Sequence, residues 1–241
     1  MELTKAQRMT IINRCRNAGA CEPEFEKLLA AESNEDFLKV LIRNIGWCHQ
    51  SNVLTSSILT ELAKNESVNV RSCVALSPKT PAVVLKKLSK DESVDVRSHV
   101  VDNPKTSASL LTELAKDEDV DVRSCAACNR KTSAVVLTEL SKDEDADVRY
   151  SVALNPRTPA SVLTEMAKDE KAGVRSYVAG NPNTPASVLN EMAKDESACV
   201  RRSLACNLKT PVVVLTEMAK DENAYVRSCV FLNPNFIPEK V

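Results

Sequence analysis

The stretch VRYSVALNPRTPASVLTEMAKDE, from Val148 to Glu170, decides the fold of this chain. Its Asn-Pro pair ends the preceding element, because proline cannot continue a helix and restricts the residue before it. Apolar residues then follow at helical spacing, at Val162, Leu163 and Met166. The stretch therefore predicts two short antiparallel helices. We expect the first to be about ten residues long and the second to be shorter and partly 3₁₀.

Two polar residues are candidate caps for these helices. Thr158 stands directly before Pro159, and proline is common at the first position of a helix. We therefore expect Thr158 to cap the first helix. Asp147 stands directly before the Val-Arg pair, and we expect it to cap the second helix.

The same stretch recurs along the chain with a fixed period of 26 residues. A Val-Arg pair marks each copy, at Val70-Arg71, Val96-Arg97, Val122-Arg123, Val148-Arg149, Val174-Arg175, Val200-Arg201 and Val226-Arg227. A constant period of this size is typical of a stacked repeat array. In such an array each repeat contacts mainly its neighbours, and the stack presents an extended surface. The sequence predicts an all-α solenoid of two-helix repeats over residues 52–241, with about seven units, the last incomplete.

Residues 1–51 follow a different pattern. We expect helices near Thr4–Asn17, Pro23–Ala31 and Asn34–His49. Terminal units of repeat arrays cover the open end of the core, so we interpret this segment as an N-terminal helical cap. Towards Val241 the pattern shows no polar capping helix, which favours self-association through that unsealed end.

Composition excludes several classes of function. The 241 residues carry 32 Lys and Arg against 33 Asp and Glu, a net charge of −1, so there is no overall attraction to nucleic acid or acidic membranes. No apolar run approaches the ~20 residues needed to span a bilayer, and the N-terminus has no signal-peptide core. The nine cysteines form no disulfide framework, which favours a reducing, cytoplasmic location. No phosphate loop, dinucleotide fingerprint or hydrolase motif is present, so we expect no enzymatic activity and no cofactor.

The repeat resembles the leucine-rich repeat variant family over residues 52–235. The shared unit is Val-Arg-x-x-Val-Ala-x-Asn-Pro-x-Thr-Pro followed by Val-Leu-x-x-Leu-Ala-x-Asp, as in the stretch quoted above. The resemblance implies a right-handed superhelix of alternating α and 3₁₀ helices that binds other macromolecules. Some members carry an iron–sulfur cluster on a cysteine-rich N-terminal module. Here that region has only Cys15, Cys21 and Cys48, while a four-iron cluster commonly takes four cysteines, so we expect no cluster.

Two charged rows recur in every repeat. Arginines run from Arg71 to Arg227 and aspartates from Asp91 to Asp221. The planar guanidinium can bind a carboxylate or carbonyl through two donors. We therefore expect hydrogen-bonded ladders between adjacent repeats. A ligand-binding or catalytic arginine is the alternative, and its recurrence in each repeat favours an architectural role.

A second basic row lies in the loops between repeats and is interrupted by Asn183. Its members are Lys79, Lys105, Lys131, Arg157 and Lys209. Stacked helices are about 8–10 Å apart, so this row could follow a phosphate backbone or an acidic protein face. The alternative is that these are solvated loop residues. Nucleic-acid binding along this row is the second functional hypothesis.

A third hypothesis is a metal or redox site. His99 and Asp102 lie three residues apart, and Cys125 and Cys128 occupy the same slots one repeat later. These four side chains are a chemically sensible zinc set, and the two cysteines could form a redox pair. The alternative is that a three-residue spacing only reflects one face of a helix. His99, Asp102 and Cys125 could also imitate a catalytic triad, but nothing in the sequence indicates an oxyanion hole.

Three residues depart from the uniform repeat. Tyr150, Tyr177 and Arg202 replace residues that are small in most repeats. Tyrosine and arginine are enriched at binding hot spots, although they could also fill local gaps. The leading hypothesis is a non-enzymatic scaffold that binds a protein or peptide along its repeat face, with specificity set by these residues.

Overall fold

All the regular structure in the described residues is α-helical. The computed structural model describes residues 3–44, 48 and 53–237. The chain divides into two compact units, Met1–Leu114 (unit 1) and Ala115–Val241 (unit 2). Unit 1 contains α1 (Lys5–Asn17), α2 (Glu22–Ala30), α3 (Asn34–Arg43), α5 (Ser56–Leu62), α6 (Val68–Leu76), α7 (Ala82–Leu88), α8 (Val94–Asp102) and α9 (Ala108–Leu114). Unit 2 contains α10 (Val120–Cys128), α11 (Ala134–Leu140), α12 (Ala146–Leu154), α13 (Ala160–Met166), α14 (Ala172–Gly180), α15 (Ala186–Met192), α16 (Ala198–Cys206), α17 (Val212–Met218) and α18 (Ala224–Leu232).

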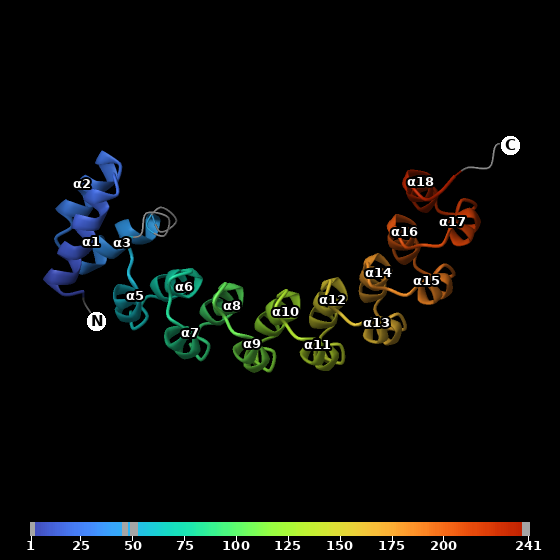
Figure 1. The fold of residues 1–241 in the computed structure, drawn as a ribbon, viewed down its shortest axis with the longest axis horizontal. Coiled ribbons are helices and arrows are strands. Elements are labelled where there is room, and N and C mark those ends of the chain that lie inside the picture. Colours follow the sequence, from blue (N-terminus) through green and yellow to red (C-terminus); the bar gives the residue numbers. More distant parts are fainter. Residues whose placement is uncertain (1–2, 45–47, 49–52, 238–241) are drawn as a thin grey trace. The chain divides into compact units, whose positions relative to one another are not determined.

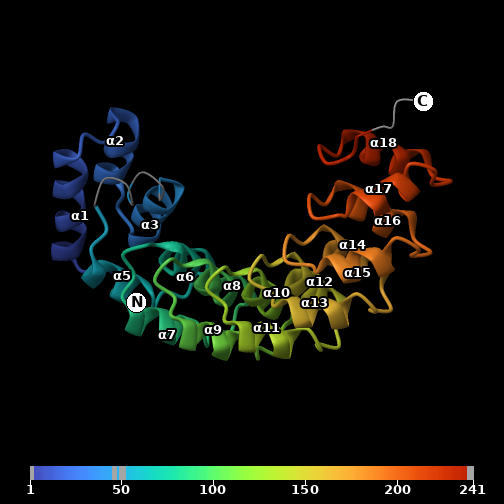
Figure 2. The same ribbon diagram turned by 45° about the vertical axis from the view of Figure 1, so that its right-hand side comes forward.

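The predicted all-α repeat fold is confirmed. In unit 2 the first helices of the repeats (α11, α13, α15, α17) form one row and the second helices (α10, α12, α14, α16, α18) form another (Figures 1 and 2). Adjacent second helices pack directly against each other, and this is the closest helix packing in the unit. Since neighbours approach more closely on the inside of a curve, the second helices lie on the concave side of unit 2.

The predicted helix lengths were wrong. The first helix of a repeat has seven residues, as in α13, and the second has nine, as in α14. Both are α-helical, so the alternation of α and 3₁₀ helices implied by the family resemblance is absent from the described repeats. The first helix is short because its end is tightened by three-residue bonds, from the amide of Lys168 to Glu165 and from Asp169 to Met166. These bonds turn the chain into the link before a tenth residue can join the helix.

Both predicted caps were also wrong. The Thr158 side chain is fully buried and donates a 2.6 Å hydrogen bond to the carbonyl of Val152, while Pro159 takes the cap position of α13. Asp145, not Asp147, caps α12 by accepting a 2.8 Å hydrogen bond from the Asp147 amide. The buried threonine therefore ties each loop to the helix before it, rather than starting the helix after it.

The first two helices predicted in the N-terminal segment are confirmed. Thr4 caps α1 in a capping box with Gln7, and α2 begins one residue before its expected start. The third, α3, ends at Arg43, and most of the rest of that predicted helix lies outside the described residues. Phe37 on α3 is fully buried. That residues 1–51 act as a cap stays a prediction.

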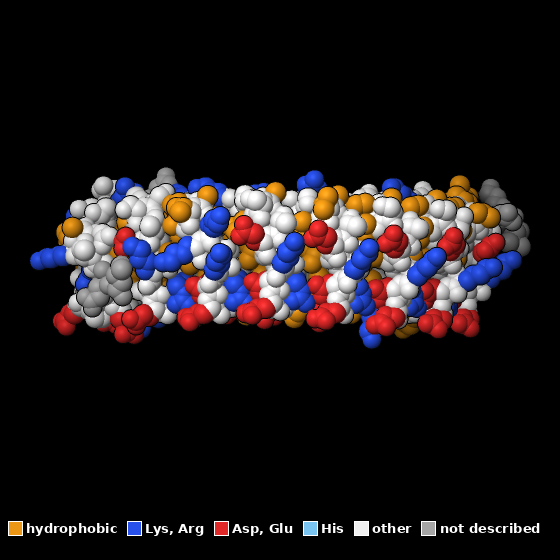
Figure 3. Space-filling model, turned by 90° about the horizontal axis from the view of Figure 1, so that it is seen from below, with side chains coloured by type: hydrophobic (Ala, Val, Ile, Leu, Met, Phe, Trp, Pro, Cys, Tyr) orange, Lys and Arg blue, Asp and Glu red, His pale blue; other side chains and the backbone are white. Residues whose placement is uncertain are grey.

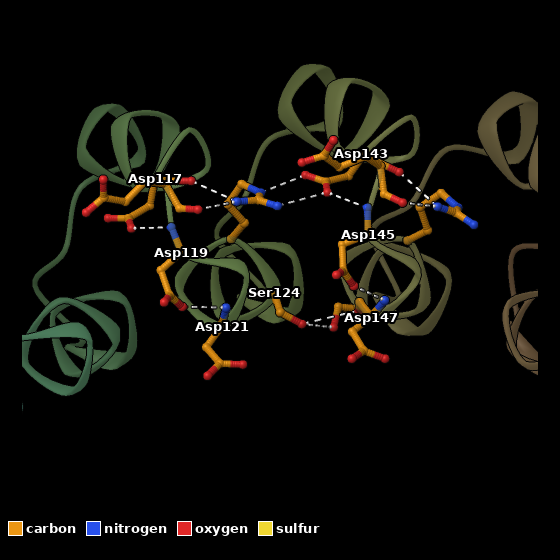
Figure 4. A network of polar contacts seen from close by, with 12 residues as sticks. Asp117, Asp119, Asp121, Ser124, Asp143, Asp145 and Asp147 are labelled. Atoms are coloured by element: carbon orange, nitrogen blue, oxygen red, sulfur yellow. Dashed lines mark hydrogen bonds and ion pairs between the residues drawn. The ribbon is translucent and has the colours of Figure 1, made fainter.

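The predicted arginine–aspartate ladder is confirmed. Arg149 donates from Nε and Nη2 to the two carboxylate oxygens of Asp169 in the next link, at 2.7 and 3.2 Å. Its Nη1 binds the carbonyls of Asp143 and Glu144 at 2.9 and 3.0 Å. Figure 4 shows this network around Asp143. The same carboxylate pairing joins Arg71 to Asp91, Arg123 to Asp143, Arg175 to Asp195, and Arg201 to Asp221.

An asparagine ladder, which the sequence did not reveal, joins the loops. Asn181 donates from Nδ2 to the carbonyls of Ala153 and Asn155 in the preceding repeat, at 2.7 and 3.1 Å. Equivalent bonds are made by Asn103, Asn155, Asn207 and Asn233. These side chains are buried, and each satisfies carbonyl groups that would otherwise be unpaired at a helix end.

The ladder carboxylates have lowered pKa values. Burial by itself would raise the pKa of Asp169, but hydrogen bonds from Arg149 and from the backbone amide of Lys171 outweigh it and lower that pKa. The pKa values of Asp91, Asp143 and Asp195 are lowered against burial in the same way, and that of Asp221 is lowered mainly by Arg201. The folded protein therefore holds these carboxylates ionised.

We expect Asp169→Asn to destabilise the protein by about 2 kcal/mol, because it replaces a charged hydrogen-bond acceptor of Arg149 with a neutral one. Urea unfolding followed by circular dichroism measures the change. Glu170→Gln is the matched control, since that neighbouring side chain is 75% exposed, and it should change stability by less than about 0.5 kcal/mol. Equal effects of the two substitutions would contradict the ladder's role.

We also expect the free energy of unfolding to fall in acid. A carboxyl group whose pKa is lower in the folded state stabilises the fold above its unfolded pKa, near 3.9 for aspartate. That stabilisation is lost as the pH falls through the folded value. Urea unfolding between about pH 5 and pH 2 should therefore show decreasing stability, with a shallower slope for Asp169→Asn. An identical slope in the variant would mean that Asp169 is not ion-paired in solution.

Candidate protein-interaction face

The exposed positions of the second helices form one stripe. In each nine-residue second helix the second, fifth, sixth and ninth positions share one face, because they are spaced i, i+3, i+4 and i+7. We call these positions in unit 2 the variable stripe. Its members are residues 121, 124, 125 and 128 of α10, 147, 150, 151 and 154 of α12, 173, 176, 177 and 180 of α14, 199, 202, 203 and 206 of α16, and 225, 228, 229 and 232 of α18. Apart from buried Ser151, all of them are exposed or half-buried.

Within the second helices of unit 2, variation between repeats is concentrated in this stripe. The third and fourth positions are valine and arginine in every second helix of unit 2. The stripe instead holds Asp, Ser, Cys, Tyr, Leu, Gly and Arg. The constant positions are those that form the core and the ladders. Packing therefore specifies the other positions and leaves the stripe free to differ.

The structure brings the two predicted tyrosines together. The ring centroids of Tyr150 on α12 and Tyr177 on α14 are 3.9 Å apart, and the rings are tilted by 53°. The same pair of slots holds hydrogen-bonded serines on either side, Ser124 with Ser151 at 2.7 Å and Ser176 with Ser203 at 2.8 Å. The tyrosine pair thus replaces a small polar contact with a half-exposed aromatic one at the middle of the stripe.

The two tyrosine hydroxyl groups interact. A hydrogen bond with Tyr177, together with burial and the nearby charges of Tyr177, Cys128 and Asp147, raises the pKa of Tyr150 to about 12. Tyr150 therefore loses its proton only in strongly alkaline solution.

Arg202 lies two helices further along the chain from Tyr150, on α16. It is exposed, no ion pair to it is found among the described residues, and it is the one cation of the variable stripe. Burial and a hydrogen bond with Cys229 of α18 raise the pKa of Cys206, on the same helix as Arg202, to about 11. The positive charge of Arg202 acts in the opposite direction and lowers that pKa. The sequence did not indicate this thiol pair, although aligning the repeats shows both cysteines in the stripe.

Two glycines in the stripe have no packing role. Gly173 and Gly180 begin and end the exposed face of α14, and a β-carbon added at either would meet no atom within 4 Å. Neither has a positive φ. Gly173 is the second and Gly180 the last residue of α14, so the cost of about 0.5–1 kcal/mol relative to alanine that a glycine carries in a helix interior is an upper limit for each. The fold does not require these glycines, and they leave open space beside Tyr177.

The basic loop row is only partly available for binding. Lys105, Lys131, Arg157 and Lys209 are exposed and Lys79 is half-buried. Arg157 donates a 3.0 Å hydrogen bond to the carbonyl of Arg130, and Asn183 and Asn235 make the equivalent bond one and three repeats later. This loop position therefore also joins adjacent repeats. On the face in Figure 3 basic and acidic side chains form alternating rows, and neither sign covers a continuous area.

The zinc set proposed from sequence is divided between the units. His99 and Asp102 belong to unit 1, and Cys125 and Cys128 belong to unit 2. Nδ1 of His99 is buried without a hydrogen-bond partner in the described structure. Across the described residues, no group of three or more His, Cys, Asp or Glu side chains is placed to hold a metal ion. The four residues sit in the sixth and ninth slots of α8 and α10, where the other repeats also vary.

The three N-terminal cysteines line one small cavity. Cys15, Cys21 and Cys48 surround about 230 Å³ together with apolar residues of α2 and α3. Burial raises the pKa of Cys15 to about 11 and that of Cys48 to about 12. Thiolates are the form that binds iron–sulfur clusters. Three thiols are one fewer than the four cysteine ligands that a four-iron cluster commonly takes, so this cavity does not fit one.

Unit 2 ends in exposed apolar side chains. Phe231, Leu232 and Ile237 are 58%, 82% and 79% exposed, and Phe231 makes an edge contact with Phe236 at 5.5 Å. The predicted self-association through this end stays a prediction. None of the helices in the described residues combines the length and apolarity needed to cross a membrane.

Comparison with known proteins supports the fold. No protein-family model and no curated protein matches the chain. Among solved structures, a leucine-rich repeat variant with a repetitive structural motif is 24% identical, with a TM-score of 0.60, over 84% of this chain and 87% of that chain. The YibA protein of E. coli is 19% identical, with a TM-score of 0.51, over 96% of this chain and 97% of that one. The resemblance to the leucine-rich repeat variant family is thus confirmed at the level of the fold.

We expect the tyrosine contact to be visible in an alkaline titration. Ultraviolet absorbance of tyrosinate should show one ionisation near pH 12, from Tyr150, and Tyr177→Phe should move it to lower pH by removing the hydrogen bond. Far-ultraviolet circular dichroism at each pH identifies any unfolding. Tyr225→Phe is the control, and it should leave the high transition in place. If Tyr177→Phe leaves the ionisation of Tyr150 at the same pH, the two rings are not in contact in solution.

Proposed function

We propose that this protein is a non-enzymatic repeat scaffold that binds a protein or peptide along the variable stripe. The observation that carries the proposal is the difference between the constant buried positions and the variable exposed positions of each second helix. The buried and ladder positions repeat almost unchanged, while the exposed stripe differs from helix to helix. A scaffold needs a stable, preformed surface with local differences that select its partner.

The composition of the stripe supports this proposal. The Tyr150–Tyr177 pair supplies large amphipathic rings with few rotatable bonds, and Arg202 supplies an exposed guanidinium. Residues of these types dominate binding energy in protein interfaces. The stripe carries two carboxylates, Asp121 and Asp147, against the one guanidinium of Arg202. That distribution does not favour a nucleic acid, which is attracted by an extended surface of positive charge.

The test is a pull-down from source-cell lysate with the tagged chain, with and without nuclease. We expect a discrete protein that survives nuclease treatment. Its recovery should fall about tenfold or more with Tyr177→Ala, since truncating an aromatic hot spot commonly costs 2 kcal/mol or more.

The matched control is Val135→Ala on the first helix α11, because that side chain is 68% exposed but lies outside the stripe. This variant should recover the partner as well as the wild type. Partner protein that is lost on nuclease digestion, and also lost in a Lys131→Ala/Arg157→Ala/Lys209→Ala variant, would replace the proposal with nucleic-acid binding along the basic loop row.

A further inference from the structure

The variable stripe has a charge polarity that follows the order of its helices. Its two carboxylates, Asp121 and Asp147, lie on α10 and α12, and its one guanidinium, Arg202, lies on α16. Asp147 and Arg202 are exposed, and neither forms an ion pair among the described residues. Between the two charges lies α14, whose stripe carries no charge.

The C-terminal end of the stripe on α12, α14 and α16 is apolar and partly empty. The ninth position of the stripe holds Leu154 on α12, which is 48% exposed, and exposed Cys206 on α16, with Gly180 between them on α14. No atom lies within 4 Å of where a β-carbon of Gly180 would stand. Tyr177 is on the same face three residues before Gly180, so an aromatic ring borders the open position.

These features fit one kind of partner. An extended peptide that crosses α12, α14 and α16 would place a cation near Asp147 and a carboxylate near Arg202. Helices in contact are about 8–10 Å apart, so the two charges of the stripe are separated by roughly 16–20 Å. At about 3.3 Å per extended residue, that distance corresponds to five or six residues.

We propose that the variable stripe over α12, α14 and α16 binds an extended peptide segment in which a basic and an acidic residue, five or six positions apart, flank an aliphatic or aromatic side chain that enters the space over Gly180. This inference rests on the proposed scaffold function and narrows it to one partner chemistry. The glycine supplies the space, Leu154 and Tyr177 supply apolar contact, and Asp147 and Arg202 fix the direction of the peptide.

The test is to pan a phage-displayed library of random peptides, each about 12 residues long to exceed the span argued above, against the full chain and against Gly180→Leu in parallel. A β-carbon at this position meets no atom within 4 Å, so a larger side chain has room to start there, and leucine favours a helix more than glycine does. The variant should therefore melt at the same temperature or higher while losing the peptides. Val135→Leu on α11 is the control, because it enlarges an exposed side chain outside the stripe.

We expect the enriched peptides to share a basic residue, a central apolar residue and an acidic residue at the spacing given above. Fluorescence polarisation of a labelled enriched peptide should show affinity reduced about tenfold or more by Gly180→Leu and unchanged by Val135→Leu. Arg202→Glu should weaken binding, and replacing the acidic residue of the peptide by lysine should restore it.

Equal binding of the peptides to wild type and Gly180→Leu would overturn this inference and leave the scaffold proposal standing, since the partner would then use another part of the face. Enriched peptides without the two charges would also overturn it. If no peptide is enriched, the inference fails, and the pull-down with Tyr177→Ala still decides whether the scaffold proposal holds.

Discussion

The bidentate ion pair between the arginine of one repeat and the aspartate of the next link is the constraint on which the structure depends. Arg149 and Asp169 are 11% and 8% exposed, so neither charge is well solvated and each needs the other. The arginine also binds the two carbonyls at the start of its own link. One side chain therefore fixes the link before its helix and the link after it. An insertion between Arg149 and Asp169 would disturb their pairing, and one between Glu144 and Arg149 would disturb the carbonyl bonds, so both spacings favour a constant period of 26 residues.

The chemistry at Asn65 illustrates how strictly this pairing is obeyed. Asn65 occupies the slot that holds aspartate in the following repeats, and the residue 26 positions before Arg71 is isoleucine rather than arginine. Its side-chain oxygen accepts a 2.9 Å hydrogen bond from the Ser67 amide, as Asp91 does from Ser93 at 3.0 Å. The local turn is therefore kept by a neutral amide in place of the carboxylate.

The sequence predicts the features that spacing determines and misses those for which another local explanation is available. The period and the pairing of arginine with aspartate follow from spacing alone. The role of Thr158 did not, because a threonine before Pro159 looks like a cap and only the folded loop shows its hydroxyl bound to Val152. The asparagine ladder was hidden for the same reason, since an Asn-Pro pair already has a sufficient local explanation as a helix terminator. At the candidate site, Tyr150, Tyr177 and Arg202 stood out as departures from the repeat. Gly173 and Gly180 did not, because their significance depends on knowing that their helix face is exposed and empty.

The ladders also explain why the stripe can hold residues that weaken a helix. Exposed glycines lower the stability of an isolated helix, and a nine-residue helix is too short to be stable alone. α14 nevertheless forms, because Val174 and Val178 are buried, Arg175 is paired with Asp195, and Asn181 bonds to the preceding repeat. None of these interactions uses a stripe residue, so a change in the stripe leaves them intact. The interactions that hold α14 in place and the positions that vary between repeats thus lie on different faces of the same helix.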